Sequence, residues 1–259
     1  MKQTEKQVFL IKRLLAENSR YCGITIPADD DEQKRLLRSL MNVRQAAPVP
    51  EDVLRVQDEY LQEESRKVGI TSVEDLMPIA DDLYLWQGDI TTLRCGAIVN
   101  AANSGMTGCY QPCHACIDNC IHTYAGMQLR LMCAEIMERQ GHEEPIGTAK
   151  ITPAYNLPCD YVLHTVGPII RGRVRPQDEA LLASCYRSCL ALAEEHGVNS
   201  IAFCCISTGV FCFPNQRAAE IAVETVQRWK QETGCAIKVI FNVFKDEDYE
   251  IYQQLLTGN

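Results

Sequence analysis

The sequence predicts an α/β fold, in which helices sandwich a mostly parallel or mixed sheet and a helical extension precedes the sheet. Two observations lead to this prediction. From residue 83 onward, short β-rich runs alternate with longer helical stretches, which is the pattern of layered α/β folds. Before residue 83, apolar residues recur at helical spacing instead. Hydrophobic residues make up 46% of the 259 residues, which is ample for a core.

The first 82 residues are expected to form three helices. Val8, Leu10, Ile11, Leu14 and Leu15 share one helical face. The acidic run at 29–32 marks the start of a second helix. The prolines at 48 and 50 separate it from a third helix over 52–66. We interpret this segment as a helical cap packed on the main domain, and a partner-docking surface is the alternative.

The remaining chain alternates between the two kinds of element. The predicted strands are 83–86, 97–99, 148–152, 161–166, 200–206 and 237–244. The predicted helices are 117–140, 177–195, 216–233 and 247–256. In such sheets, ligands bind beyond the carboxyl ends of the strands. The most distinctive stretches of this chain lie in those loops.

One loop carries three metal-binding side chains. Cys109, His114 and Cys116 lie within eight residues of one another. Two thiolates and an imidazole are ligands that suit Zn²⁺. Catalytic zinc sites usually have three protein ligands and one open position, whereas structural sites have four. The spacing therefore predicts one zinc ion per chain in an open, catalytic site.

Two further cysteines leave alternatives to the open site. Cys113 directly precedes His114 and would have to point back toward the same ion. Cys120 is one turn into the following helix, where a small buried residue is expected anyway. A closed structural site that includes one of them, and a loop without metal, are the two alternatives.

Residues suited to a nucleotide end several predicted strands. Asp89 follows the first strand, and its carboxylate can accept a hydrogen bond from an exocyclic amine such as that of adenine. Asn100 and Asn103 carry both donors and acceptors, which suits ribose hydroxyls. Phe244 closes the last strand and offers a face on which adenine can stack. Ordinary turn or core roles are the alternative for each of these residues.

The loop from Ser207 to Pro214 joins a buried strand to a helix. Backbone N–H groups at such a junction can cradle phosphate oxygens, helped by the helix dipole. The loop has neither the Walker pattern nor the glycine pattern of dinucleotide-binding folds. Phe211 and Phe213 offer flat faces for a sugar or base, and a plain turn with core aromatic residues is the alternative.

Composition excludes several classes of function. The net charge is −9, whereas a nucleic-acid-binding surface needs basic residues. No apolar run reaches membrane-spanning length, and residues 1–6 lead into an amphipathic helix rather than a signal peptide. Without a signal peptide, the fourteen cysteines indicate reduced thiols, some of them metal ligands. We expect a cytoplasmic protein with no nucleic-acid or membrane partner.

Taken together, six ordered blocks resemble the macrodomain family, whose members bind ADP-ribose. The blocks are Gly88–Ile90, Ala97–Asn103, Ile121–Gly126, Gly147–Ala149, Leu163–Pro168 and Ile206–Pro214. The Cys/His loop and the helical extension are similar to those of zinc-containing microbial macrodomains, which remove ADP-ribose from proteins and are linked to sirtuin-type ADP-ribosyltransferases. The resemblance implies a three-layer α/β/α macrodomain with a mixed sheet over 83–259, after a helical extension over 1–82.

By position, the resemblance also implies roles for individual residues. Asp89 would hold the adenine amine, and Ile90 would line its pocket. Asn100 and Asn103 would contact the distal ribose. Asp118 falls where hydrolytic macrodomains often carry a functional acid, and Asn103 and Asp118 are the predicted catalytic residues. The residues that would wrap the diphosphate and that ribose are Ser207, Thr208, Gly209, Val210 and Phe211.

The chain departs from the family pattern at two places. The Cys/His loop replaces a Gly-rich stretch after Asn103, which changes the expected catalytic scheme. Cys212 replaces a usual glycine of the diphosphate loop, which bears on the shape of that loop.

We therefore predict a zinc-dependent hydrolase that removes mono-ADP-ribose from modified protein side chains. The metal would orient or ionise a water molecule, and Asp118 would act as general base or fix that water. His122 is a weaker candidate, since a structural role within the following helix is more typical. The alternatives are a reader that binds ADP-ribose without cleaving it and a deacylase of O-acyl-ADP-ribose. A functional link to a sirtuin-type ADP-ribosyltransferase and its acceptor protein is implied by the resemblance.

Overall fold

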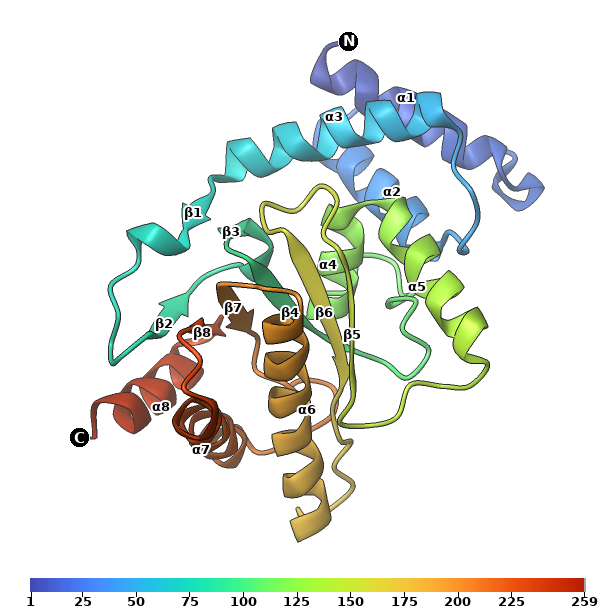
Figure 1. Cartoon of the computed structure of the whole chain (residues 1–259). Coiled ribbons are helices and arrows are strands. Elements are labelled where there is room, and N and C mark those ends of the chain that lie inside the picture. Colours follow the sequence, from blue (N-terminus) through green and yellow to red (C-terminus); the bar gives the residue numbers. More distant parts are fainter. Residues whose placement is uncertain (259) are drawn as a thin grey trace.

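The computed structural model describes residues 1–258 and contains a central six-stranded sheet in the order β2-β8-β7-β4-β6-β5 (Figure 1). The strands are β2 (Leu83–Gln87), β4 (Ala97–Ala102), β5 (Ala149–Pro153), β6 (Tyr161–Val166), β7 (Ser200–Phe203) and β8 (Lys238–Val243). All neighbours pair in parallel except β5, which runs antiparallel to β6 at the edge. The sheet is mixed, as predicted.

Helices cover both faces of this sheet. They are α4 (Ile117–Ala125), α5 (Met127–Gln140), α6 (Pro176–Glu195), α7 (Asn215–Thr233) and α8 (Asp246–Thr257). Crossovers between parallel strands are right-handed. The chain moves across the sheet in one direction from β4 to β6 and in the other from β6 through β7 to β8. The right-handed rule therefore places α4 and α5 on one face and α6 and α7 on the other, which completes three layers.

The helical N-terminal extension is also present. It consists of α1 (Gln3–Ala16), α2 (Asp30–Val43) and α3 (Glu51–Val68), and it lies across one end of the molecule (Figure 1). Its helices share a small core of their own, and α2 and α3 both contact α4. A short strand, β1 (Thr71–Ser72), then pairs in parallel with β3 (Leu93–Arg94). The boundary at residue 82 stays a prediction.

Two predicted elements end earlier than expected. The predicted helix 117–140 is divided into α4 and α5 by Gly126, whose φ of +101° is a conformation that side-chain-bearing residues rarely adopt. The predicted strand 200–206 stops at Phe203, because the chain turns into a loop in which Ser207 has a φ of +67°. The break after Phe203 leaves the following residues to form a loop at the end of the sheet, whereas α5 begins directly after Gly126.

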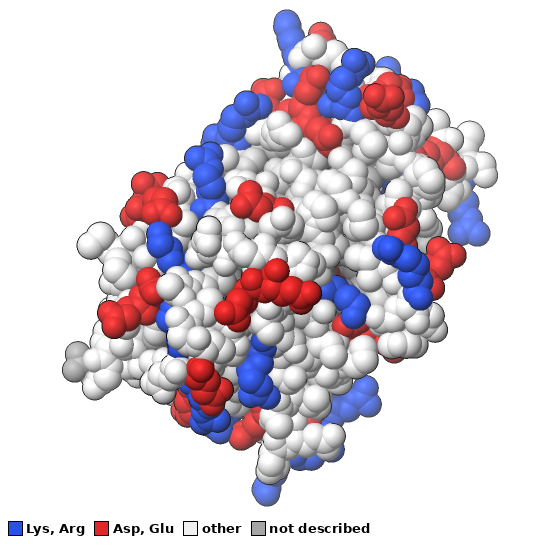
Figure 2. Space-filling model, viewed as in Figure 1, with Lys and Arg blue, Asp and Glu red and all other residues white. Residues whose placement is uncertain are grey.

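On the face shown in Figure 2, acidic and basic side chains are interspersed. Within residues 1–258, no helix combines the length and the apolar character needed to cross a membrane.

Candidate functional site

Most of the predicted site residues lie in the segments that follow β2, β4, β7 and β8, whereas Asn100 lies in β4 itself and Asp118 in α4. These four strands are parallel, so their carboxyl ends meet at one edge of the sheet. The loop after β4 leads to the three metal-binding side chains and then into α4. The loop after β7 is the predicted diphosphate loop, and Asp89 and Phe244 follow β2 and β8.

The three predicted zinc ligands are brought together. The ligand atoms of Cys109, His114 and Cys116 all lie within 4.8 Å of one another. Cys109 Sγ is 3.6 Å from His114 Nδ1. Zinc–sulfur bonds of about 2.3 Å and zinc–nitrogen bonds of about 2.0–2.1 Å in a tetrahedron place S and N about 3.5 Å apart. The donor set therefore fits zinc in both chemistry and spacing.

Burial disfavours the ionised form of the Cys116 thiol, so its ionisation requires a nearby positive charge. Burial raises the pKa of the Cys116 thiol to about 12, and the neighbouring Cys109 thiol adds to the rise. Cys116 is the N-cap of α4, and its Sγ accepts a hydrogen bond from Asn119 N at 3.4 Å. A metal ion supplies the positive charge that lets coordinating thiols ionise.

The other two cysteines point elsewhere. Cys113 Sγ lies 3.2 Å from Ser39 Oγ on α2. Cys120 Sγ lies 3.6 Å from Arg38 Nη2, also on α2. Neither belongs to the group of close ligand atoms, so this arrangement has three donors and not four.

Asp118, two residues after Cys116, lies in a buried polar network. It is 5% exposed, and burial raises the pKa of its carboxyl to about 6, against hydrogen bonds that lower it. Asn100 Nδ2 donates to its Oδ1 at 2.8 Å, and Asn103 Nδ2 donates to its Oδ2 at 3.2 Å. The structure thus brings the predicted catalytic residues Asn103 and Asp118 into direct contact.

Asn100 is more deeply buried than a residue that contacts the ribose needs to be. Its side chain is fully buried, and its Nδ2 lies 3.1 Å from His164 Nδ1 in addition to its bond to Asp118. Asn100 therefore orients Asp118, and its predicted contact with the distal ribose stays a prediction. Sequence reasoning missed this role because Asp118 reaches Asn100 only through the packing of α4 on β4, and His164 reaches it only through the pairing of β4 with β6.

His122 has a packing role in this network. Its Nε2 is 3.6 Å from Asp118 Oδ1, and burial lowers the pKa of its imidazole well below 6.5. Gly108, with a φ of +84°, lies so close to the ring that a Cβ there would be 2.7 Å from His122 Cγ. The His122 ring therefore packs against Gly108, at the start of the Cys/His loop, and restricts the backbone there.

A second group of metal-binding residue types lies in the core. The ligand atoms of His122, Cys133 and His164 also lie within 4.8 Å of one another, and all three residues are buried. His164 Nε2 is 2.9 Å from Thr152 Oγ1, and His164 Nδ1 is 3.1 Å from Asn100 Nδ2. Since both nitrogens of His164 have polar partners, we interpret this group as part of the polar core.

At the predicted adenine end, Asp89 is exposed and Ile90 is 2% exposed. Asp89 Oδ1 accepts from Thr91 N at 2.9 Å and from Thr91 Oγ1 at 2.7 Å, which caps the short helical turn that follows. No such bond engages Oδ2 within residues 1–258. That oxygen is available to a ligand amine, as the prediction requires. Phe244 is 76% exposed, so it is not the core residue of the alternative interpretation.

The predicted diphosphate loop is tightly turned. Two residues of the loop have left-handed backbone conformations, Ser207 with a φ of +67° and Cys212 with a φ of +56°. Glycine adopts this left-handed conformation more readily than cysteine does, which explains why the family usually has glycine at position 212. Phe213 is buried and cannot offer a face to a ligand, whereas Val210 is 71% exposed and Phe211 is half-buried. The contacts predicted for 207–211 stay predictions.

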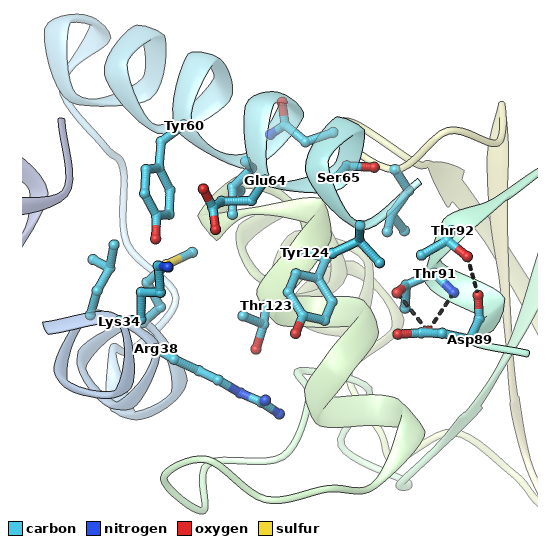
Figure 3. Close-up of a pocket in the computed structure, with 16 residues that line it drawn as sticks. Lys34, Arg38, Tyr60, Glu64, Ser65, Asp89, Thr91, Thr92, Thr123 and Tyr124 are labelled. Atoms are coloured by element: carbon cyan, nitrogen blue, oxygen red, sulfur yellow. Dashed lines mark hydrogen bonds between the residues drawn. The ribbon is translucent and has the colours of Figure 1, made fainter. Parts of the chain in front are cut away.

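A pocket of about 200 Å³ lies between the extension and the rest of the chain (Figure 3). Its walls come from α2, α3, α4 and the Asp89 turn, and Asp89 is the one predicted site residue that lines it. Figure 3 shows Arg38 reaching out of α2 past Thr123 and Tyr124. No sequence motif marks Arg38, so sequence reasoning had no signal for it.

Comparisons with known proteins agree with this architecture. Residues 99–222 match the Macro domain family. A protein-ADP-ribose hydrolase of Treponema medium is 62% identical over 261 residues, which cover 99% of this chain and 100% of that protein. A probable bifunctional ADP-ribose hydrolase/ADP-ribosyltransferase of Fusarium oxysporum is 42% identical over 85% of this chain and 40% of that protein. The structure of a Trypanosoma brucei macrodomain in complex with ADP-ribose is 30% identical over 85% of this chain and 94% of that chain, with a TM-score of 0.65.

Proposed function

Because this chain belongs to the macrodomain family, we propose that it is a hydrolase that removes ADP-ribose from modified proteins with a bound zinc ion. The 62% identity to a protein-ADP-ribose hydrolase along the whole chain supports the hydrolase activity. The observation that carries the zinc dependence is the group of Cys109, His114 and Cys116 beside the buried Asp118.

The substrate would lie across the loops at the carboxyl ends of the strands. Asp89 Oδ2 would accept a hydrogen bond from the adenine amine, and the exposed Phe244 would stack on the ring. The 207–211 loop would surround the diphosphate. This orientation leaves the distal ribose, and the bond that joins its anomeric carbon to the protein, on the side of Asn103 and the Cys/His loop.

The chemistry at that end requires a water molecule and a base. When bound, zinc supplies a Lewis acid that lowers the pKa of a coordinated water. Cys109, His114 and Cys116 would hold it. Asp118 would take up the proton as water attacks, and a pKa of about 6 suits a base that works near neutral pH. Asn100 and Asn103 hold the two carboxylate oxygens in place. Hydrolysis releases ADP-ribose and the free protein side chain.

We test the zinc dependence with Cys116→Ala and Cys109→Ala. Purified, anaerobically prepared protein should contain close to one zinc per chain, and both variants should lose it, because two remaining ligands rarely hold the ion. Cys116→Ala should still bind ADP-ribose but should release it from a mono-ADP-ribosylated protein at least about 100-fold more slowly. Circular dichroism checks that the variants are folded.

The outcomes separate the alternatives. A folded Cys116→Ala protein with wild-type turnover would overturn the catalytic role of the metal. A wild-type protein that binds ADP-ribose but releases none from modified protein would be a reader. Turnover of O-acyl-ADP-ribose without turnover of modified protein would identify a deacylase.

We also propose a functional link to an ADP-ribosyltransferase of the sirtuin type, which would supply the modified acceptor protein. The Fusarium relative, named a probable bifunctional hydrolase/transferase, supports such a pairing of activities. We further propose that the protein acts in the cytoplasm, where its cysteines stay reduced. Co-expression with a candidate transferase and its acceptor, followed by loss of the modification, would test the link.

A further inference from the structure

We infer that α2 of the N-terminal extension holds the metal loop, residues 109–116, in the shape that binds the ion, with Arg38 as the main positioning residue. The metal site itself rests on the function proposed above. The metal loop contains no helix or strand, so its shape depends on side chains that reach it from other elements. Several of these side chains come from α2.

Arg38 makes the most direct connection. Its Nη2 donates to His114 O at 2.9 Å and to Asn119 Oδ1 at 3.0 Å. The first bond holds the backbone of the histidine ligand itself. The second orients Asn119, whose Nδ2 donates to two more carbonyls of the metal loop, those of Cys109 at 3.3 Å and Gln111 at 3.0 Å. One guanidinium thus fixes the loop near two of its three ligands.

A strained residue beside the histidine ligand is also held by α2. Cys113 has a φ of +52°, and such a conformation persists only where the surroundings over-determine it. Cys113 N donates to Asn42 Oδ1 at 2.9 Å, and Cys113 Sγ lies 3.2 Å from Ser39 Oγ. The conformation that directs His114 toward the two ligand thiols is therefore stabilised from the extension.

The end of α2 is anchored in turn. Arg130 on α5 is 5% exposed, and its Nη1 donates to Asn42 O at 2.7 Å and Met41 O at 3.2 Å. Its guanidinium also stacks 4.3 Å from the ring centre of Tyr110, in the metal loop. Nearby, the pocket of about 200 Å³ interrupts the packing between α2, α3 and α4 (Figure 3). Hydrogen bonds of Arg38 and Asn42 join α2 to the metal loop.

The test measures the affinity for zinc, by competition with a chelator in anaerobic protein. Arg38→Met removes the donors but keeps much of the apolar stem. We expect it to bind zinc about 10- to 100-fold more weakly, as for other residues that orient ligands. Arg35→Met is the matched control: it lies three residues earlier on α2 and is exposed, and within residues 1–258 its side chain makes no hydrogen bond or ion pair. It should bind zinc and ADP-ribose as the wild type does.

Hydrogen exchange in metal-free protein provides a second readout that does not depend on the ion. The amides of 109–116 should exchange faster in Arg38→Met than in Arg35→Met. A purely stabilising role would lower the thermal midpoint of Arg38→Met without changing the zinc affinity or the relative exchange of the metal loop. That result would overturn the inference.

The two proposals can fail separately. If the wild type binds no zinc, the zinc site fails and hydrogen exchange alone decides the role of α2. If the wild type binds zinc and Arg38→Met binds it equally tightly, with unchanged exchange, α2 has no positioning role and the zinc site stands. Should Arg38→Met not fold, Arg38→Lys allows the same comparison, because it keeps the charge but lacks the forked donor geometry.

Discussion

Asp118 and Asp89 are both carboxylates of the site, yet they lie in opposite environments. Asp118 is 5% exposed and receives one amide donor on each oxygen, and burial raises its pKa to about 6. Asp89 is exposed, and only its Oδ1 is engaged within the chain. The first environment suits a group that accepts and releases a proton, whereas the second leaves one oxygen available to accept a hydrogen bond from a ligand.

This difference makes Asp89 testable by a small change. Asp89→Asn keeps one oxygen that can cap the following turn but replaces the other with an NH₂ group, which cannot accept from the adenine amine. We expect ADP-ribose to bind about 10- to 100-fold more weakly, since hydrogen bonds to charged groups contribute about 1.5–3 kcal/mol. Isothermal titration calorimetry measures the loss.

An analogue that carries unsubstituted purine in place of adenine serves as the matched ligand, because it lacks the exocyclic amine and has no other polar group in its place. The wild type should bind the analogue more weakly than ADP-ribose, and Asp89→Asn should bind the two alike. If the variant still discriminates between them, Asp89 does not hold the adenine amine.

Among the elements, the Cys/His loop and α4 form one unit. Gly108 lies against the buried ring of His122, and Cys116 at the far end of the loop caps α4. The backbone at Gly108 and at Cys116 is therefore restricted by contacts with α4. This arrangement positions three metal donors and Asp118 within a single stretch of chain.

Gly108→Ala should show how tightly the loop packs. The added Cβ would lie 2.7 Å from His122 Cγ, on a ring that is 4% exposed and cannot move away. Gly141→Ala is the matched control, because its φ of +75° imposes a similar backbone strain while nothing lies within 4 Å of the new Cβ. We expect Gly108→Ala to be less stable than Gly141→Ala by about 1–3 kcal/mol, measured by urea denaturation. Equal stabilities would mean that the loop is free to shift.

For the whole molecule, the buried polar core predicts how stability depends on pH. Burial lowers the pKa of His164 from 6.5 to about 4. The folded protein therefore keeps this imidazole neutral, while the unfolded chain takes up a proton as the pH falls through 6.5. The contribution to stability is present above pH 6.5 and is lost between pH 6.5 and about 4, up to about 3 kcal/mol at 1.36 kcal/mol per unit.

His164→Gln should make the free energy of unfolding depend less on pH in this range. The free energy of unfolding, measured between pH 7 and pH 4, should fall less steeply for His164→Gln than for the wild type. His142→Gln removes an exposed imidazole and is the control for the substitution itself. Parallel curves for His164→Gln and the wild type would contradict the prediction. The difference between the two curves reports His164 together with its effect on the neighbouring His122, whose pKa it also lowers.

Much of the fold follows from local patterns. The predicted strand 161–166 coincides with β6, and the predicted helix 177–195 differs from α6 by one residue. The break at Gly126 was not predicted, because it depends on distant contacts: a Cβ there would lie 2.7 Å from Gln57 Nε2 on α3. Local spacing cannot reveal such a neighbour.

The sequence by itself determined which side chains share a loop. Cys109, His114 and Cys116 are close in space because they are close along the chain, and Asp89 follows a strand because the apolar run before it stops. Only the tertiary structure decided what those side chains face. It brought Asn100 to Asp118 through the packing of α4 on β4, and it brought Arg38 to His114 across 76 positions of the chain. The physical reason is that spacing along a chain sets distances only within a few turns, whereas burial and hydrogen-bond partners depend on how whole elements pack.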